Sequence, residues 1–256
     1  MEVNGYKIRP GADLAGADLP KANLIRADLT GAKLQDANLY IANLAFANLT
    51  DAILIRAKLS SANLAGVILK GANLTRANLT GANLRGVDLA GVILKGANLT
   101  RANLTGANLT GANLTDVNLA GVILKSVNLT EVNLTEEDLS GQDLAGVILK
   151  GANLTRANLT GANLTGAKMQ GTNLAKANLT DANLEGANLY SANLEGANLE
   201  RANMDSTALG DANLTRANLQ HATFHRSNLT NAKVTDPNLR GAWLRITTMP
   251  DGSIHD

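Results

Sequence analysis

The side chains that most often carry enzyme chemistry are few in this chain. It has three histidines and no cysteine, so thiolate metal sites and disulfides are excluded. His221 and His225 stand four residues apart, a spacing at which two imidazoles on one face of a helix can bind a metal ion. This pair is therefore a metal site only if the segment is helical. The glycine-rich stretches, such as GANLTGANL, have neither the spacing nor the strand-to-helix setting of a phosphate-binding loop.

A second concentration of ionisable groups lies in the stretch TEEDLSGQDL. Glu137, Asp138 and Asp143 fall within seven residues of one another, and Gln142 lies among them. Carboxylate oxygens this close in sequence are candidate ligands for a cation. Whether they can act together depends on which faces of the local structure they occupy.

The elements that position these groups are set by a period of five. Leucine recurs at every fifth residue from Leu14 to Leu244, and only four of these 47 positions carry another residue, apolar each time. A small residue, usually alanine, lies two residues earlier, and Asn or Asp lies between them in 35 of the 47 quintets. Copies of the 21-residue stretch LAGVILKGANLTRANLTGANL begin at Leu64, Leu89 and Leu144. Such self-similarity is typical of a repeat architecture.

A five-residue period fits neither a long helix nor a long strand. Leucines five apart would wander around a helix of 3.6 residues per turn, and five is odd for a strand of period two. Short strands with a corner after each quintet resolve the conflict, because the small residue and the leucine then share the inner face. Of the 24 glycines, 21 occupy the last position of a quintet, where a type II turn favours a positive φ. Arginine or lysine at this position, as at Arg76 and Lys176, predicts another turn type or a tolerated variant.

This Ala-Asn/Asp-Leu-x-x pattern resembles the pentapeptide repeat family. The resemblance implies an all-β fold, a right-handed quadrilateral parallel β-helix with four quintets per coil and about 12 square coils. We assign residues 12–245 to the β-helix, residues 1–11 to an N-terminal lead-in, and residues 246–256 to a C-terminal capping tail. The ending MPDGSIHD is similar to that of several cyanobacterial family members and indicates such a source.

When the chain follows this five-residue register, the histidines and carboxylates considered above fall on different positions of the coil. His221 and His225 fall on different corners, so we expect no metal site, no cofactor and no catalytic residue. Glu137 and Gln142 take the inward small position, where an unpaired carboxylate is costly. Either the coil bulges at Glu137, Asp138, Gln142 and Asp143, or Glu137 has a partner such as a cation.

Four apolar residues at outward positions form the candidate contact patch. Ile25, Tyr40, Ile41 and Phe46 lie in two adjacent coils, and exposed apolar clusters mark interaction sites. Isoleucines that replace Asn elsewhere in the chain scatter over three faces. The favoured function is a non-catalytic scaffold or protein-interaction module. Its biological role is unassigned, and regulation is one role that we consider.

The net charge of the chain limits which other functions are plausible. The net charge of +1 gives no reason to expect nucleic acid or an anionic membrane, and no apolar stretch is long enough to span a bilayer. Some pentapeptide repeat proteins bind DNA gyrase as mimics of B-DNA, which requires an acidic surface. This DNA-mimic function is the main alternative, and an enzyme is disfavoured. The absence of cysteine and of a signal peptide favours a cytoplasmic location.

The C-terminal end needs a cover, because an open β-helix end exposes unpaired strand edges. Pro237 interrupts the pattern, Trp243 is a large apolar residue, and the turn at Pro250 and Gly252 can return Ile254 over the last leucines. We therefore expect a monomer. The alternative is a dimer through the C-terminal ends.

Overall fold

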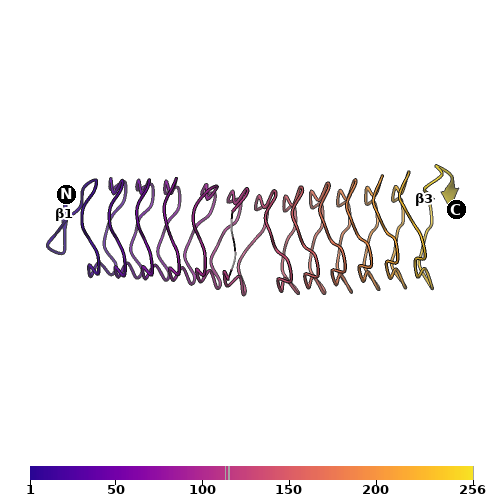
Figure 1. The fold of residues 1–256 in the computed structure, drawn as a ribbon, viewed down its shortest axis with the longest axis horizontal. Helices are drawn as coiled ribbons and strands as arrows, with labels where there is room; N and C mark the ends of the chain where they lie inside the picture. The colour runs from indigo at the N-terminus through magenta and orange to yellow at the C-terminus, as the bar shows by residue number, and fades with distance from the viewer. Residues whose placement is uncertain (113, 115, 256) are drawn as a thin grey trace. The chain divides into compact units, whose positions relative to one another are not determined.

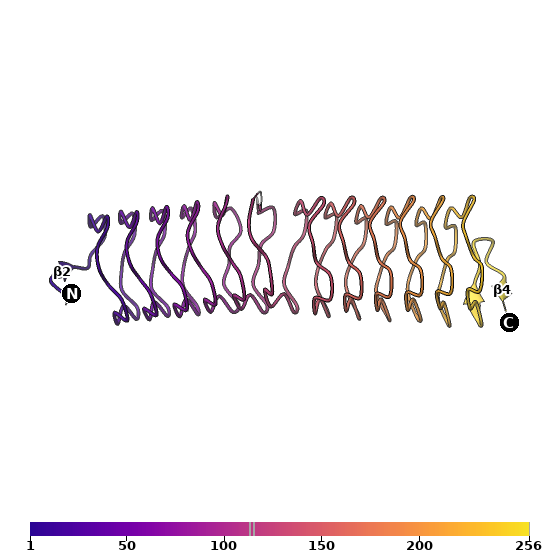
Figure 2. The same cartoon turned by 90° about the horizontal axis from the view of Figure 1, so that it is seen from below.

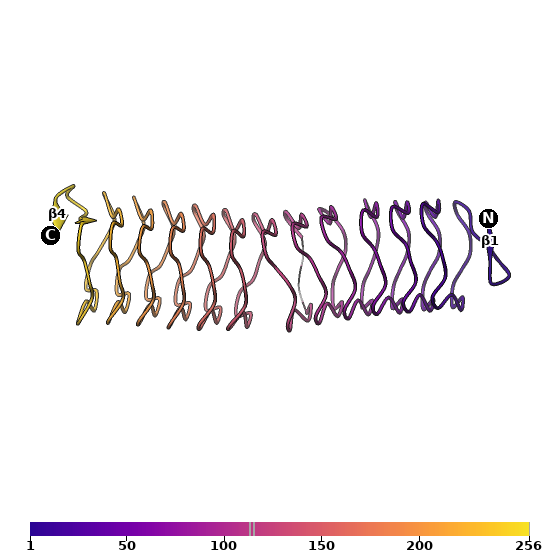
Figure 3. The same cartoon turned by 180° about the vertical axis from the view of Figure 1, so that it is seen from behind.

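The computed structural model describes residues 1–256 except Asn113, Thr115 and Asp256. The chain forms two compact units, Met1–Asn128 and Leu129–Asp256. Within each unit, successive coils of chain lie side by side (Figure 1), and the same arrangement is visible from below (Figure 2) and from behind (Figure 3). Among the described residues there is no helix, in agreement with the predicted all-β fold.

Within each unit, a residue pairs with the residue 20 positions later. Asp13 bridges Lys33 in parallel, Leu14 N–H donates to the Lys33 carbonyl at 2.8 Å, and Lys33 N–H donates to the Ala12 carbonyl at 2.9 Å. We call one such paired position a rung. Because 20 residues are four quintets, each coil has four sides. The predicted quadrilateral coil is therefore confirmed in each unit.

Each corner is a tight turn, and the last residue of the quintet, which is the third residue of this turn, has a positive φ. Ala17 N–H donates to the Leu14 carbonyl at 3.0 Å, and Gly16 between them has a φ of 66°. Arg76 and Lys176 at the equivalent position have φ values of 56° and 59°. The turn therefore keeps its conformation without glycine, and these residues are tolerated variants in a left-handed conformation that disfavours side chains.

The core consists of the leucine and small-residue columns. Leu19, Leu89 and Leu109 have no exposed surface, and the small residues two positions earlier are buried as well. A few buried positions are polar, and their hydroxyls are hydrogen-bonded. Thr172 Oγ1, for example, donates to the Leu149 carbonyl at 2.7 Å. This agrees with the rule that a buried polar group retains a partner.

Short hairpins lie at both termini. β1 (Glu2–Val3) pairs antiparallel with β2 (Tyr6–Lys7), and β3 (Thr247–Thr248) pairs antiparallel with β4 (Ile254–His255). β3 also continues the parallel ladder, because Thr248 bridges Asn228. Among the described residues there is also no helix that could cross a membrane.

One rung of the first unit is open. Among its described residues, Ile68 and Asp88 are the only pair at the 20-residue offset that lacks a bridge. Here the inward small position carries valine in both coils, at Val67 and Val87, whereas the rungs with valine opposite alanine are closed. Two stacked β-branched side chains hold the backbones apart, because a packed core does not accept extra methyl groups freely. A cleft of about 400 Å³ results.

Candidate protein-interaction surface

The structure places the three histidines at two different corners and at the chain end. His221 takes the last position of its quintet with a φ of 57°, and the Nδ1 atom of His225 lies 3.2 Å from the Arg245 carbonyl oxygen. His255 belongs to the terminal strand β4 and is exposed. No group of three or more metal-ligating side chains comes together among the described residues. The helical geometry that would make His221 and His225 a ligand pair is not present.

The acidic segment keeps the register of the ladder. Asp138 bridges Asn158, and Asp143 bridges Asn163, so no residue is inserted and the segment does not bulge toward the following coil. Glu137 is half-buried at the inward position, and burial raises the pKa of its carboxyl. Gln142 is half-buried in the same way.

The outward carboxylates of this segment are bound to the ladder itself. Asp138 Oδ1 accepts hydrogen bonds from Ser140 N–H at 3.1 Å and from Asn158 Nδ2 at 2.9 Å. Hydrogen bonds from Ser140, and then from Asn158, lower the pKa of Asp138. Asp143 accepts a bond from Asn163 Nδ2 at 2.9 Å. The four residues therefore do not converge on one cation.

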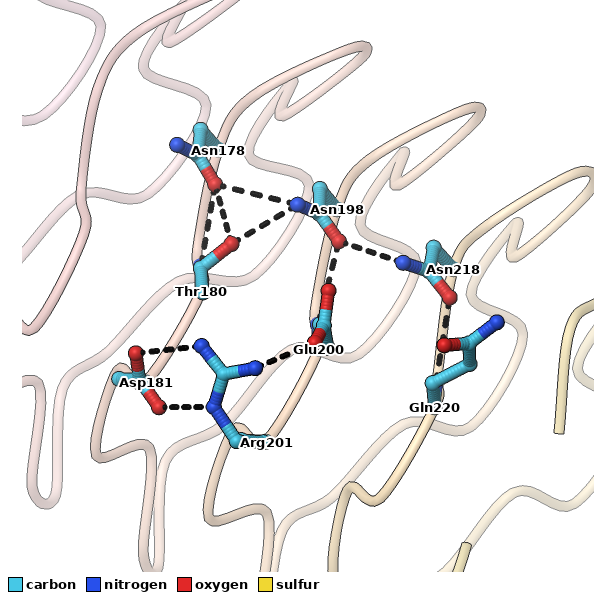
Figure 4. A network of polar contacts seen from close by, with 8 residues as sticks. All are labelled: Asn178, Thr180, Asp181, Asn198, Glu200, Arg201, Asn218 and Gln220. Carbon is cyan, nitrogen blue, oxygen red and sulfur yellow. Dashed lines mark hydrogen bonds and ion pairs between the residues drawn. The ribbon is translucent and has the colours of Figure 1, made fainter. Parts of the chain in front are cut away.

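The asparagines of the faces are held in side-chain ladders, as Figure 4 shows for the second unit. Asn178 Oδ1 accepts from Thr180 N–H at 3.2 Å, Asn198 Nδ2 donates to Thr180 Oγ1 at 2.8 Å, and Asn218 Nδ2 donates to Asn198 Oδ1 at 2.9 Å. These bonds tie each Asn to its own corner and to the next coil. The Asn columns are thus structural, and their polar atoms are largely occupied.

At the corners, oppositely charged side chains 20 residues apart form ion pairs between neighbouring coils. Arg56 contacts Asp36 through two bonds of 2.7 and 2.5 Å. In the second unit Arg201 bonds Asp181 at 2.7 and 2.9 Å and also contacts Glu200 (Figure 4). Arg56, Asp36, Arg201 and Asp181 are about half exposed and Glu200 is partly buried, so each pair contributes little to stability.

The predicted contact patch is exposed. Ile25, Tyr40, Ile41 and Phe46 have exposed fractions of 43, 46, 41 and 61%. We call these four residues the apolar cluster. They lie at the two corners that border one face of the first unit, where Asn23, Asn43 and Asn63 bridge in succession, with Tyr40 and Ile41 at one corner and Ile25 and Phe46 at the other.

Two features fix the apolar cluster in place. Phe46 lies against the next corner, because a side-chain carbon built at Gly66 would be 2.6 Å from two of its ring carbons. The backbone N–H of Ile41 donates to the Ser60 carbonyl at 3.0 Å, and that of Phe46 donates to the Ala65 carbonyl at 3.0 Å. These side chains therefore stand on a paired backbone rather than on a loop.

Two residues beside the apolar cluster were not identified from the sequence. Lys21 precedes Ile41 by 20 residues, and Arg26 precedes Phe46 by 20 residues, so each lies one coil away at the same corner. Both are exposed. Arrangement of the sequence in columns of 20 would have revealed them.

The C-terminal residues are placed differently from the expectation. Pro237 and Pro250 line an apolar pocket of about 300 Å³ at the end of the second unit. Trp243 and Ile254, however, are 72 and 63% exposed. Trp243 stands at the outward position of its quintet, which the five-residue register itself determines.

The orientation of Ile254 follows from strand pairing. Ile254 is opposite Thr248 in the β3–β4 hairpin, and opposite residues share a face. Thr247 points inward, with its hydroxyl 2.6 Å from the Phe224 carbonyl oxygen. Thr248 and Ile254 therefore point outward. Ile254 does not return over the last leucines, and Gly252 provides the positive-φ turn of the hairpin.

Comparison with known proteins identifies one family model, described as pentapeptide repeats (8 copies). It matches ten stretches, most of which overlap, at residues 11–40, 42–81, 57–96, 82–121, 97–135, 123–161, 138–171, 157–196, 167–205 and 207–245. No protein with a curated description matches the chain.

Several solved structures are similar. HetL, a pentapeptide repeat protein involved in heterocyst differentiation regulation from the cyanobacterium Nostoc sp. strain PCC 7120, is 34% identical, with 95% of this chain and 93% of that chain covered and a TM-score of 0.39. Rfr23 from the cyanobacterium Cyanothece 51142 is 36% identical over 44% of this chain and 83% of its own, with a TM-score of 0.20. QnrB1, a plasmid-mediated fluoroquinolone resistance protein, is 16% identical over 76% of this chain and 90% of its own, with a TM-score of 0.29.

Proposed function

Because the chain belongs to the pentapeptide repeat family, whose members fold as right-handed quadrilateral β-helices, we propose that it is a non-catalytic scaffold that binds another protein. Members of this family are in general structural or interaction modules. The observation that carries the proposal is the apolar cluster, whose four side chains are exposed at the two corners that border one hydrogen-bonded face. Exposed apolar clusters of this kind favour protein contact.

Two further features support an interaction role over catalysis. Many of the Asn and Asp side chains of the faces are engaged in ladder hydrogen bonds, which leaves few of them free to act on a substrate. The described histidines are separated on different corners or at the chain end. The repeat thus supplies a rigid surface rather than a reactive group.

A regulatory role in the cytoplasm is the form of this function that we favour. HetL is involved in heterocyst differentiation regulation, and it matches nearly the whole chain at 34% identity. We extend from it only the idea of a regulatory role in a cyanobacterium, and the contact with a partner protein is our own proposal from the apolar cluster.

Affinity capture from a cyanobacterial lysate, followed by mass spectrometry, tests the proposal. The test variant carries Tyr40→Ser, Ile41→Ser and Phe46→Gly, which are the residues that the next coil has at the same positions. The fold should accept them for that reason. The control carries Ile68→Asn and Ile93→Asn, which remove exposed isoleucines from other faces and restore the common residue.

We expect a protein that the wild type and the control retain and that the test variant loses. Equal retention by all three proteins, or no specific retention by the wild type, would contradict the proposed function. A circular dichroism spectrum of each variant verifies that the coil is intact.

A further inference from the structure

The face that holds the apolar cluster carries charge of one sign only. Its five rungs are continuous across six coils, because Asn23, Asn43, Asn63, Asn83, Asn103 and Ile123 bridge in succession. The residues of this face are 20–26, 40–46, 60–66, 80–86, 100–106 and 120–126. They include five basic side chains and no Asp or Glu. We call this surface the basic face.

Its five basic groups are exposed and free of carboxylate partners. They border the face along its two corners, and none takes part in an ion pair among the described residues. They are Lys21, Arg26, Arg85, Arg101 and Lys125.

The carboxylates of the same coils all lie on other faces. Within residues 12–128 there are seven, at Asp13, Asp18, Asp28, Asp36, Asp51, Asp88 and Asp116. The separation is therefore a property of the face and not of the whole chain, whose charges nearly cancel.

We infer that the basic face, with the apolar cluster near its N-terminal end, docks an acidic protein segment that carries apolar side chains. This inference rests on the proposed function and adds the chemistry of the partner. Charge complementarity selects an acidic partner and suppresses basic ones. The apolar cluster contributes favourable free energy only against apolar groups, since the gain comes from removing apolar surface from water.

The dimensions suit an extended segment. The five rungs are spaced by about 4.8 Å each, so the face is about 24 Å long, which about eight extended residues span. Basic groups lie in the coil that begins the face and in the last three coils. The two coils between them, residues 40–66, have no charge on this face and carry Tyr40, Ile41 and Phe46.

This gap argues against a nucleic acid as the occupant. A phosphate backbone carries charge at every nucleotide and would leave the phosphates over the uncharged coils unpaired. Base stacking on Tyr40 and Phe46 is the one contact that single-stranded DNA could make there. The experiment therefore includes a DNA arm.

Fluorescence anisotropy of labelled probes tests the inference. The probes are a peptide in which two glutamates alternate with one leucine, a peptide with serine in place of each glutamate, and an oligo-dT strand. The test variant is Arg85→Glu with Arg101→Glu. The control is Lys33→Glu with Lys58→Glu, which makes the same change in net charge on other faces of the first unit.

We expect the Glu/Leu peptide to bind in preference to the other two probes, and more weakly as salt is raised. The test variant should lose about tenfold or more in affinity, and the control much less. Phe46→Gly should also weaken the Glu/Leu peptide, which separates apolar docking from charge attraction alone.

Three results would overturn the inference: no binding of the Glu/Leu peptide, an equal loss in test and control variants, or preference for oligo-dT. If the peptide fails while lysate capture still depends on the apolar cluster, the proposed function stands and only the acidic chemistry of the partner falls. If capture fails as well, both are wrong.

Discussion

The last residue of each quintet is where single side chains have the clearest energetic effect. Gly161 has a φ of 64°, and a side-chain carbon placed there would meet no atom within 4 Å. A substitution at Gly161 therefore causes no steric clash with neighbouring atoms, and its effect on stability reports the backbone conformation alone.

We predict that Gly161→Ala lowers the free energy of unfolding by about 1 kcal/mol, because alanine is strained in the left-handed region. Gly161→Asn should lose less, since Asn adopts this conformation more readily. Urea unfolding of the three proteins measures both effects. An alanine variant as stable as the wild type would contradict the role assigned to φ.

Through the single residue Glu137, the stability of the folded protein depends on pH. Burial raises the pKa of its carboxyl in the folded state, so folding favours the protonated form. The contribution of Glu137 to stability is then most favourable below its ordinary pKa, near 4.3, and is lost as the pH rises through the folded value.

Glu137→Ala should therefore raise stability at neutral pH by less than about 1 kcal/mol, because solvent screens a half-buried carboxylate, and this gain should disappear in acid. Gln142→Ala is the control, because it alters an equivalent inward position without a titrating group. Thermal unfolding of the three proteins between pH 4 and pH 8 measures the difference. A gain that does not change with pH would refute the burial argument for Glu137.

At the scale of one element, the open rung between Ile68 and Asp88 shows how the core controls the ladder. The inward pair Val67 and Val87 holds these strands apart, whereas alanine opposite valine does not. Amide hydrogens that lack a ladder partner are weakly protected from exchange.

We predict that the amides of Leu69 and Asp88 exchange at least about tenfold faster than those of Leu89 and Asn108, which are bonded at 2.7 and 3.0 Å. Val87→Ala should close the rung and slow the exchange of Leu69 and Asp88. Hydrogen exchange followed by nuclear magnetic resonance provides the rates. If Val87→Ala leaves both amides as fast as before, the valine pair is not the cause.

The repeated element was predictable from sequence because its period is local. Leucine, the small residue and glycine each recur at one position of five. As the pattern predicts, the leucines and small residues form the core, and the glycines at the last position have a positive φ. The direction of Ile254 was not predictable in this way, because it depends on which strand pairs with β4. Glu137 required the structure too, since sequence left both a bulge and a partner open.

The basic face was missed for a different reason. Net charge over the whole chain is +1, and this sum conceals a face of the first unit on which five positive groups meet no negative one. Charge must be counted by face in a repeat protein, because residues 20 apart are neighbours. The apolar cluster, in contrast, was found from adjacent coils alone.

At the scale of the molecule, the amount of charge decides against DNA mimicry. The most acidic face of the second unit, within residues 140–206, carries five carboxylates and Arg201, a net of −4. Its four coils span about 15 Å, over which B-DNA carries about nine negative charges. A gyrase site that binds phosphates would find less than half of that charge.

We therefore predict that the protein does not inhibit DNA supercoiling by gyrase at concentrations where an acidic pentapeptide repeat protein does. The acidic protein, assayed in parallel, is the positive control. Potent inhibition that weakens with added salt would favour DNA mimicry over the scaffold function.

The proposed function requires that a partner protein contacts the face of the apolar cluster. Site-specific photocrosslinking in the native host detects such a contact, with benzoylphenylalanine in place of Phe46, which is 61% exposed, and, as control, in place of Ile93, which is 47% exposed on another face. We predict a light-dependent adduct with one protein from position 46 and none from position 93. Adducts of equal yield from both positions, or an adduct from position 93 alone, would contradict the claim.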